Sequence, residues 1–324
     1  MMTKYSEIAD KIKNTYENPS VNLNPKYALH WYIRRFRISG EKKYTKLISQ
    51  NMNKMLPKML NSLDAATSDE KCNIYANHVL KAYKITSPRR QRRASYYSKH
   101  PEVITYALSV LYLFVIKSLG LDTNVLYKDK FEEALKYLST KNIYKLFLDK
   151  ELIKADPSEC ANIIYNAYYL GLFDKRNDLL NIYNEYWVSL KPNDNYEWLD
   201  KIYALTHIII ATSNYYQNFV NYADYKTILN YFEKDIENIA RNVNVDSLGE
   251  VGLCFKLAGI KSNDIIDKVK IVLTEHFNEE IGYIPHDKYV NNLNKSEHRN
   301  IIANMVLSDF DRLYKGPYLG DKIL

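Results

Sequence analysis

Glycine and proline are scarce in this sequence, with nine residues of each among 324. They are spread thinly, and the chain has no Ser/Gly-rich linker, no low-complexity tract and no series of alternating Val/Ile/Thr segments. Strands and hairpins depend on such signals, so their lack argues against a β-rich fold and against domains joined by flexible linkers. We therefore predict an all-α protein with a single domain over residues 1–324.

Cysteine is also rare, since only Cys72, Cys160 and Cys254 occur and they stand far apart. An odd, scattered set predicts neither a disulfide framework nor a CxxC zinc site, and it favours reduced, intracellular conditions. The N-terminus has no apolar segment typical of a signal peptide, and the apolar run 103–116 is too short to span a bilayer. The expected location is cytoplasmic, without a membrane partner.

Several short motifs of enzyme chemistry are missing as well. HExxH, GxSxG, the P-loop and GxGxxG do not occur, so nucleotide chemistry has no support and no cofactor is expected. The net charge of +7 arises from 45 Lys and Arg against 38 Asp and Glu. That excess is mild and dispersed, and a nucleic-acid partner is not expected. An AT-rich coding bias explains the thirty tyrosines more simply than a stacking surface does.

What the chain does contain is a series of apolar segments, each ending at glycine, proline or a polar pair. They cover residues 27–38, 73–85, 103–119, 161–170, 202–212, 250–258 and 301–307. More polar segments with one apolar stripe lie between them, at 44–63, 126–138, 178–187, 224–241 and 264–277. Apolar residues on nearly every face predict buried helices, and one stripe predicts a helix with a solvent-facing side.

This alternation predicts helical hairpins in two concentric layers, with the apolar helices inside. Such hairpins close into an (α/α) toroid, and the alternative is an open α-superhelix. We assign residues 1–23 to an N-terminal helical extension, 24–310 to the toroid and 311–324 to a C-terminal tail.

Three phrases carry a family resemblance: IYALTHIIIATSNYY, GEVGLCFKLAG and SEHRNIIANMVL. With the hairpin period, they resemble the (α/α)-toroid (six-hairpin-like) superfamily over about residues 24–310, and within it uncharacterised bacterial proteins. The resemblance implies a site in a central cavity, at one end of the inner helices. Members include glycoside hydrolases, lyases, prenyl and terpene enzymes and lanthionine cyclases. The acidic clusters of terpene cyclases and the Cys-His pair of lanthionine cyclases are absent here.

The candidate catalytic residues are His207, Glu250, Glu297, His298 and Tyr203, because carboxylates and histidines in a cavity are suited to proton transfer. Each has a structural alternative. His207 is also explained as a core histidine, and His298 as an exposed residue of a first helical turn.

The two glutamates have capping alternatives. Glu250 stands three residues after Ser247, and Glu297 three after Asn294. This is the capping-box spacing, in which the acid bonds back to the start of its helix. A zinc site of Cys254, His298 and His207 is a further, minor alternative.

One loop is predicted at residues 87–95, SPRRQRRAS, with Arg89, Arg90, Arg92 and Arg93 as candidate anion-binding residues. Guanidinium groups bind phosphate and carboxylate well, although a solvated loop explains the same pattern.

Two functions follow. The first is an acid/base hydrolase or lyase that acts on a sugar or other polar or anionic small molecule in the cavity. The alternative is a non-catalytic helical scaffold that binds a peptide or protein partner through the arginine-rich loop.

Overall fold

The computed structural model describes residues 4–320 and confirms the all-α prediction. This part of the chain contains sixteen α-helices and one π-helix, and its only β features are two isolated bridges. The helices are α1 Lys4–Tyr16, α2 Pro25–Ser39, α3 Lys43–Ala65, α4 Asp69–Lys81, α5 Pro88–Lys99, α6 Glu102–Ser118, α7 Lys128–Ser139, α8 Ile143–Phe147, α9 Lys150–Ala155, α10 Pro157–Leu170, α11 Arg176–Ile182, the π-helix Tyr183–Val188, α12 Asn195–Thr212, α13 Tyr222–Asn242, α14 Val245–Leu257, α15 Asp264–Glu275 and α16 Leu293–Leu307.

The chain divides into two compact units, each made of two separate stretches. The first combines Met1–Met52 with Thr212–Gly316, and the second combines Asn53–Ala211 with Pro317–Leu324. Each unit has its own buried core.

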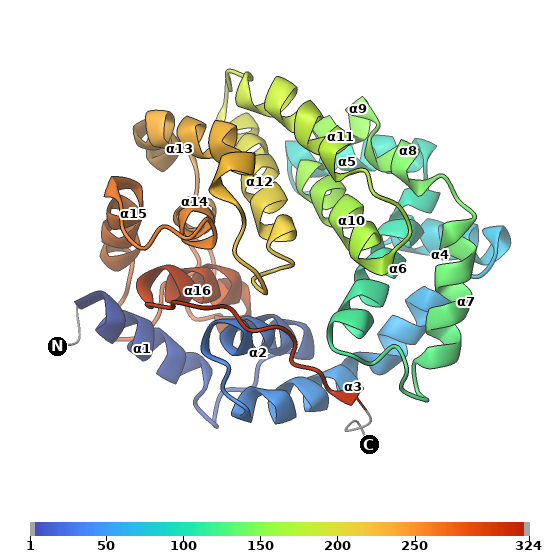
Figure 1. Cartoon of the computed structure of the whole chain (residues 1–324), viewed down its shortest axis with the longest axis horizontal. Coiled ribbons are helices and arrows are strands. Elements are labelled where there is room, and N and C mark those ends of the chain that lie inside the picture. Colours follow the sequence, from blue (N-terminus) through green and yellow to red (C-terminus); the bar gives the residue numbers. More distant parts are fainter. Residues whose placement is uncertain (1–3, 321–324) are drawn as a thin grey trace. The chain divides into compact units, whose positions relative to one another are not determined.

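Helix α16 is the centre of the first unit. It lies between α14 and α2 and also contacts α1 and α15, while α13 packs against α14 (Figure 1). From Ser296 to Leu307 every side chain of α16 except His298 is buried, so the outer helices α1, α13 and α15 need only one apolar stripe each.

The buried polar side chains of α16 have partners within the unit. The amide of Asn300 donates to Ile284 O at 2.7 Å and accepts from Ile284 N at 2.8 Å. Asn304 donates to Ala9 O at 2.8 Å and accepts from Arg35 Nη1 at 2.7 Å. Buried polar groups are tolerated when they are hydrogen-bonded in this way.

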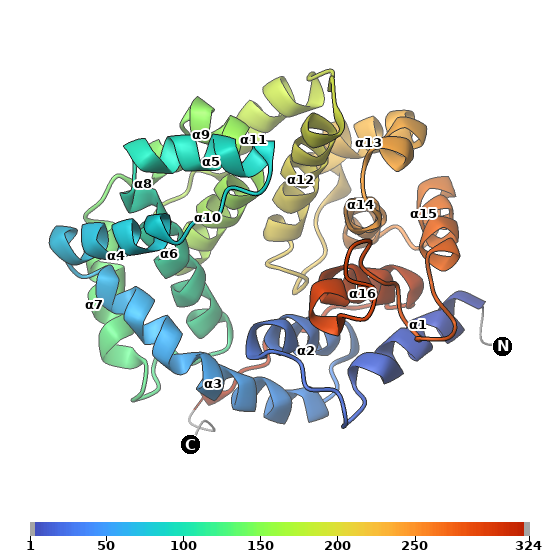
Figure 2. The same ribbon diagram turned by 180° about the vertical axis from the view of Figure 1, so that it is seen from behind.

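Helices α6 and α10 form the core of the second unit and lie side by side (Figure 2). Helices α4, α5 and α7 contact α6, and α8, α9 and α11 contact α10. No single helix between residues 4 and 320 is long and apolar enough to cross a membrane; only α5 and α6 together reach that length, and they are bent by 105°.

Several predicted boundaries are confirmed and two assignments are wrong. Helices α2 and α10 end at Gly40 and Gly171, which both adopt the left-handed conformation that glycine accommodates best. The segment predicted as a buried helix at 73–85 is instead α4, where only Cys72 and Ala76 are buried and Ile74 is 63% exposed. Its charged and polar side chains leave α4 too narrow an apolar stripe for an interior position.

The loop predicted at 87–95 is a helix. The Ser87 side chain accepts a hydrogen bond from Arg90 N and Pro88 takes the first helical position, so α5 starts there and includes all four arginines. A serine cap followed by proline is a normal helix start.

The predicted N-terminal extension is part of the first core, because α1 buries Ile8, Ala9, Ile12 and Tyr16 and contacts α16. In the predicted tail, Tyr314 N donates to Arg37 O at 2.8 Å. Residues 1–3 and 321–324 of these two assignments lie outside the described residues. The closure of the hairpins into a toroid stays a prediction.

Candidate active site

The starts of α14 and α16 place two glutamates inside the first unit. Asn244 caps α14 by accepting from Ser247 N, and Asn292 caps α16 by accepting from Lys295 N. The capping boxes predicted for Glu250 and Glu297 are therefore wrong. Each helix begins earlier than those boxes require, so each acid falls in its second turn, where its side chain is 1% exposed.

His298 of α16 lies between two carboxylates of α14. Its Nε2 is 3.4 Å from Glu250 Oε1, and its Nδ1 is 3.7 Å from Asp246 Oδ2. Burial opposes protonation of the ring, but the Asp246 and Glu250 carboxylates outweigh it and raise the pKa of His298. Burial alone would raise the pKa of Asp246. His298 and Arg299 lower it by a larger amount, so the pKa of Asp246 lies below its usual value. His298 therefore carries the proton of this group.

A second imidazole–carboxyl pair has the opposite arrangement of charge. His30 Nδ1 of α2 lies 2.8 Å from Glu297 Oε1. Burial raises the pKa of Glu297 to about 7, against the opposing charges of Arg34 and His298. Burial, followed by the charges of Arg34 and His298, holds the pKa of His30 well below its usual range. His30 is thus neutral near pH 7.

The two imidazole rings are neighbours, with ring centres 5.4 Å apart and planes inclined by 35°. They are also the accessible members of the group, because the side chain of His30 is 26% exposed and that of His298 is 36% exposed. Each ring is backed by a nearly inaccessible glutamate. A neutral and a protonated imidazole side by side can accept and donate a proton at one bound molecule.

Arg299 closes the buried side of this group. Its Nε lies 2.8 Å from Asp246 Oδ1 and its Nη1 lies 2.9 Å from Asp287 Oδ1, while the side chain is 3% exposed. The guanidinium thereby fixes the carboxylate that faces His298. This is a supporting contact behind the ring, of the kind that orients a reactive histidine.

The zinc alternative gains no support. Among residues 4–320 no group of three His, Cys, Asp or Glu side chains is placed to hold a metal ion. Cys254 is fully buried, and burial raises the pKa of its thiol well above the usual range, so the thiolate that a metal needs is disfavoured.

The other two catalytic candidates belong to α12 of the second unit. Tyr203 and His207 are one helical turn apart, and their rings are 5.9 Å apart. His207 Nδ1 lies 3.3 Å from Asn162 Oδ1, and the Arg89 guanidinium lies 4.8 Å from the centre of the Tyr203 ring. The structure thus brings together Glu250, Glu297 and His298 in one unit, and Tyr203 and His207 in the other.

Most of the predicted anion-binding arginines face aspartates of their own unit. Arg89 Nε lies 2.6 Å from Asp200 Oδ1, and Arg92 pairs with the same carboxylate. Arg93 lies 2.6 Å from Asp156 Oδ1. Arg90 is exposed and donates to Lys84 O at 2.9 Å. The charges of Arg89, Arg92 and Arg93 are largely balanced within the fold, and anion binding by α5 stays a prediction.

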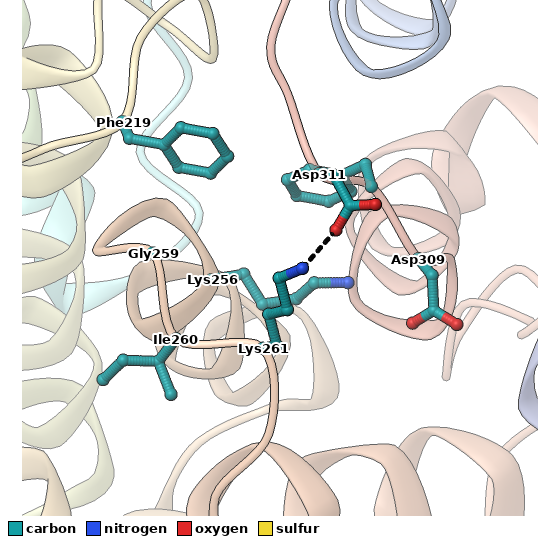
Figure 3. Close-up of a pocket in the computed structure, with 8 residues that line it drawn as sticks. Phe219, Lys256, Gly259, Ile260, Lys261, Asp309 and Asp311 are labelled. Atoms are coloured by element: carbon teal, nitrogen blue, oxygen red, sulfur yellow. Dashed lines mark hydrogen bonds and ion pairs between the residues drawn. The ribbon is translucent and has the colours of Figure 1, made fainter.

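A pocket of about 390 Å³ lies elsewhere in the first unit, at the C-terminal ends of α14 and α16 (Figure 3). It is lined by Phe219, Lys256, Gly259, Ile260, Lys261, Asp309, Phe310 and Asp311. Burial lowers the pKa of Lys256 to about 7. The ammonium donates to the carbonyl oxygens of Met305, Val306 and Ser308, so it caps the end of α16 and has no proton left for a ligand.

Four residues around His30 and His298 were not among the sequence candidates for catalysis: His30, Arg34, Asp246 and Arg299. His30 had the same signal as His207, a histidine inside an apolar segment. Asp246 and Arg299 carry no local signal, because their roles come from contacts between helices. Arg34 stands in the sequence cluster Arg34, Arg35 and Arg37, which is compatible with anion binding.

Comparison with known proteins gives a family and nothing beyond it. No curated protein and no solved structure matches the chain. The family described as Domain of unknown function (DUF3541) matches residues 5–323. Because this match covers nearly the entire sequence, the chain belongs to the DUF3541 family.

Proposed function

We propose that this protein is an acid/base hydrolase or lyase that acts on a sugar or other polar or anionic small molecule at His30 and His298. One observation carries the proposal: two imidazole–carboxyl pairs lie side by side with opposite pKa shifts. Titratable neighbours whose pKa values are pushed apart are suited to the roles of acid and base.

The roles follow from the protonation states. His298, held protonated by Asp246 and Glu250, is the general acid that donates to a leaving group. His30 is neutral, and when Glu297 is ionised its carboxylate accepts from Nδ1–H, which leaves Nε2 of His30 free to accept a proton. Matched acid and base groups accelerate such reactions by about 10²–10⁴-fold. The toroid arrangement, a bacterial source and a cytoplasmic location belong to this proposal, and a role for Tyr203 and His207 of the second unit stays a separate prediction.

The alternative of a peptide-binding scaffold has less support. It relied on a free arginine-rich loop, and those residues form helix α5, where Arg89, Arg92 and Arg93 pair with Asp200 and Asp156. Arginines already paired with buried aspartates have less to gain from an acidic partner.

The test is a turnover screen with the full chain on neutral glycosides, uronate-containing oligosaccharides and simple hydroxy-acid esters. Released reducing ends report hydrolysis, and new carbon–carbon double bonds report elimination. Wild type is compared with His298→Ala, His30→Ala and Glu250→Gln. The control is His276→Ala, because His276 is an exposed residue at the end of α15, with Nδ1 2.9 Å from Val272 O.

We expect the three site variants to lose at least about a hundredfold in rate while the control keeps wild-type rate. Turnover by His298→Ala and His30→Ala at the wild-type rate rejects the proposal, and so does a screen in which the wild-type protein converts no substrate of these classes.

A further inference from the structure

We infer that Arg34 binds an oxyanion of the substrate, a carboxylate or a phosphate, beside the two histidines. This inference rests on the proposed function of the site and names the substrate class. It differs from the sequence prediction, which assigned anion binding to the arginines of α5.

Arg34 is a cation next to the histidines without a carboxylate of its own. It lies one helical turn after His30 on α2, and its Nη1 donates to His30 O at 3.1 Å. Its Nε is buried without a hydrogen-bond partner, and among residues 4–320 no carboxylate lies within 4.0 Å of its guanidinium. A half-buried charge without a counter-ion is costly, and an oxyanion supplies what is missing.

The neighbouring arginines of the first unit are different. Arg35 lies 3.5 Å from Glu17 and donates to Asn304, and Arg37 donates to Tyr215 O and Gly316 O. Arg299 holds two aspartates. These side chains join elements of the fold, whereas no carboxylate pairs with Arg34 among residues 4–320. Guanidinium forks bind carboxylate and phosphate through two parallel hydrogen bonds.

A strained turn supports Arg34 from below. Asn214, Tyr215 and Tyr216 adopt positive φ of 52°, 52° and 71°, a conformation that non-glycine residues rarely adopt and that is found at functional sites. Ser213 Oγ accepts from Tyr216 N at 2.8 Å and Gln217 Nε2 donates to Asn214 O at 2.9 Å. The backbone is thus held firmly in this strained form.

The strained turn fixes the position of the Tyr216 ring. Tyr216 is 2% exposed, and the Arg34 Cζ lies 5.1 Å from its ring centre. A guanidinium over an aromatic face is attracted to it and loses little freedom when a ligand binds. Tyr216 is therefore a positioning residue for Arg34.

An anion at Arg34 is close enough to act on the histidines, since the charge of Arg34 lowers the pKa of both His30 and His298. Binding of an anion offsets that charge. The other charged groups around the two rings are Glu250, Glu297, Asp246 and Lys26. Binding of an anion is therefore expected to change the NMR signals of His30 and His298.

The experiment records the imidazole Cε1–H signals of the full chain by NMR during titration with acetate, with inorganic phosphate and with neutral acetamide. Saturable shifts of the His30 and His298 signals are expected with at least one anion and none with acetamide. The anion that binds more tightly tells a carboxylate substrate from a phosphorylated one. Arg34→Gln weakens that binding at least tenfold, and Arg34→Lys keeps part of it because a lysine retains the charge without the fork.

The matched control is Arg241→Gln, since Arg241 is an exposed arginine in the last turn of α13. It leaves anion affinity at the wild-type value. Tyr216→Leu removes the ring beneath Arg34 and weakens affinity several-fold, which keeps the inference testable if Arg34→Gln does not fold. Unchanged anion affinity in Arg34→Gln, or no saturable shift with either anion, overturns the inference.

Failure of this inference is distinguishable from failure of the acid/base function, because anion binding is measured without turnover. Binding that needs Arg34 in a protein without turnover keeps the anion site and rejects the enzyme. Turnover of an anionic substrate whose KM is unchanged in Arg34→Gln keeps the acid/base function and rejects the anion site.

Discussion

His30 Nδ1 lies 2.8 Å from Glu297 Oε1, and this short contact joins a neutral imidazole to a carboxyl whose pKa is about 7. Below that pH the glutamate holds the proton and donates it to Nδ1, so the ring proton sits on Nε2. Above it the carboxylate accepts from the ring instead. A change of ring tautomer thus accompanies the ionisation of Glu297, close to neutral pH.

The first prediction concerns the pH dependence of stability. The folded-state pKa of Glu297 is raised from 4.5 to about 7, so the stabilisation from its protonated form is complete below pH 4.5 and is lost as pH rises through 7. The loss is ~3 kcal/mol at most. Glu297→Gln stays neutral and should remove this part of the decline in unfolding free energy.

The measurement is urea unfolding at about pH 5 and about pH 8, one on each side of the ionisation of Glu297. Glu279→Gln is the control, because Glu279 is exposed and its partner is the exposed Lys11. An unfolding free energy that falls equally with pH in wild type and Glu297→Gln would contradict the assignment.

The second prediction concerns His298. The pKa of His298 is raised by the carboxylates of Asp246 and Glu250 against the effect of burial, so Glu250→Gln should lower the midpoint of its titration. The measurement is the pH titration of its Cε1–H signal by NMR, with His276 as an internal reference. A midpoint that does not change in Glu250→Gln would show that the 3.4 Å contact is without influence in solution.

The third prediction compares two glycines of α14. A Cβ at Gly249 would come within 2.8 Å of Ile302 on α16, whereas a Cβ at Gly252 would come within 3.0 Å of Val269 on α15. Either alanine should cost ~1–3 kcal/mol through overpacking. Only Gly249→Ala should push α14 from α16 and so lower the pKa of His298.

Urea unfolding together with the His298 titration separates the two effects of these alanines. Equal His298 midpoints in Gly249→Ala and Gly252→Ala would refute a close dependence of the site on the α14–α16 contact.

The fourth prediction concerns the pocket at the end of α16. Lys256→Met leaves the carbonyl oxygens of Met305, Val306 and Ser308 without their donor and should reduce unfolding free energy by ~2–4 kcal/mol. Lys261→Met at the same pocket removes only an exposed pair with Asp311 and should cost less than ~1 kcal/mol. Similar losses for both variants in urea unfolding would argue against a capping role.

Local signals in the sequence were enough for most of the helices. Gly40 and Gly171 marked helix ends because a left-handed terminal residue is nearly always glycine. Ser87 and Pro88 carry the same kind of signal, a capping residue followed by a first-turn proline. This signal predicts a helix where the arginine-rich segment was interpreted as a loop. The prediction of a buried helix at 73–85 failed for another reason: α4 has only a narrow apolar stripe, and its contacts with α6 bury Cys72 and Ala76 alone.

The site was predictable residue by residue but not as a group. Glu250, Glu297 and His298 were candidates from the sequence, yet Asn244 and Asn292 compete with Ser247 and Asn294 as helix starts, and no local rule chooses between caps a few residues apart. His30 is separated from Glu297 by 267 residues. A pairing over that distance depends on how α2 packs against α16, which periodicity does not encode.

The hydrogen bonds of Asn300 and Asn304 decide more than the stability of α16. An entirely apolar interior helix could turn about its own axis or slip by one residue and still bury the same surface. Here any such turn breaks the hydrogen bonds of both amides, including the one that Asn304 accepts from Arg35. Helix α16 therefore has one rotational position about its axis, and in that position Glu297 faces His30 and His298 faces Glu250. The hydrogen bonds of the two amides thus set which side chains of α16 reach the candidate site.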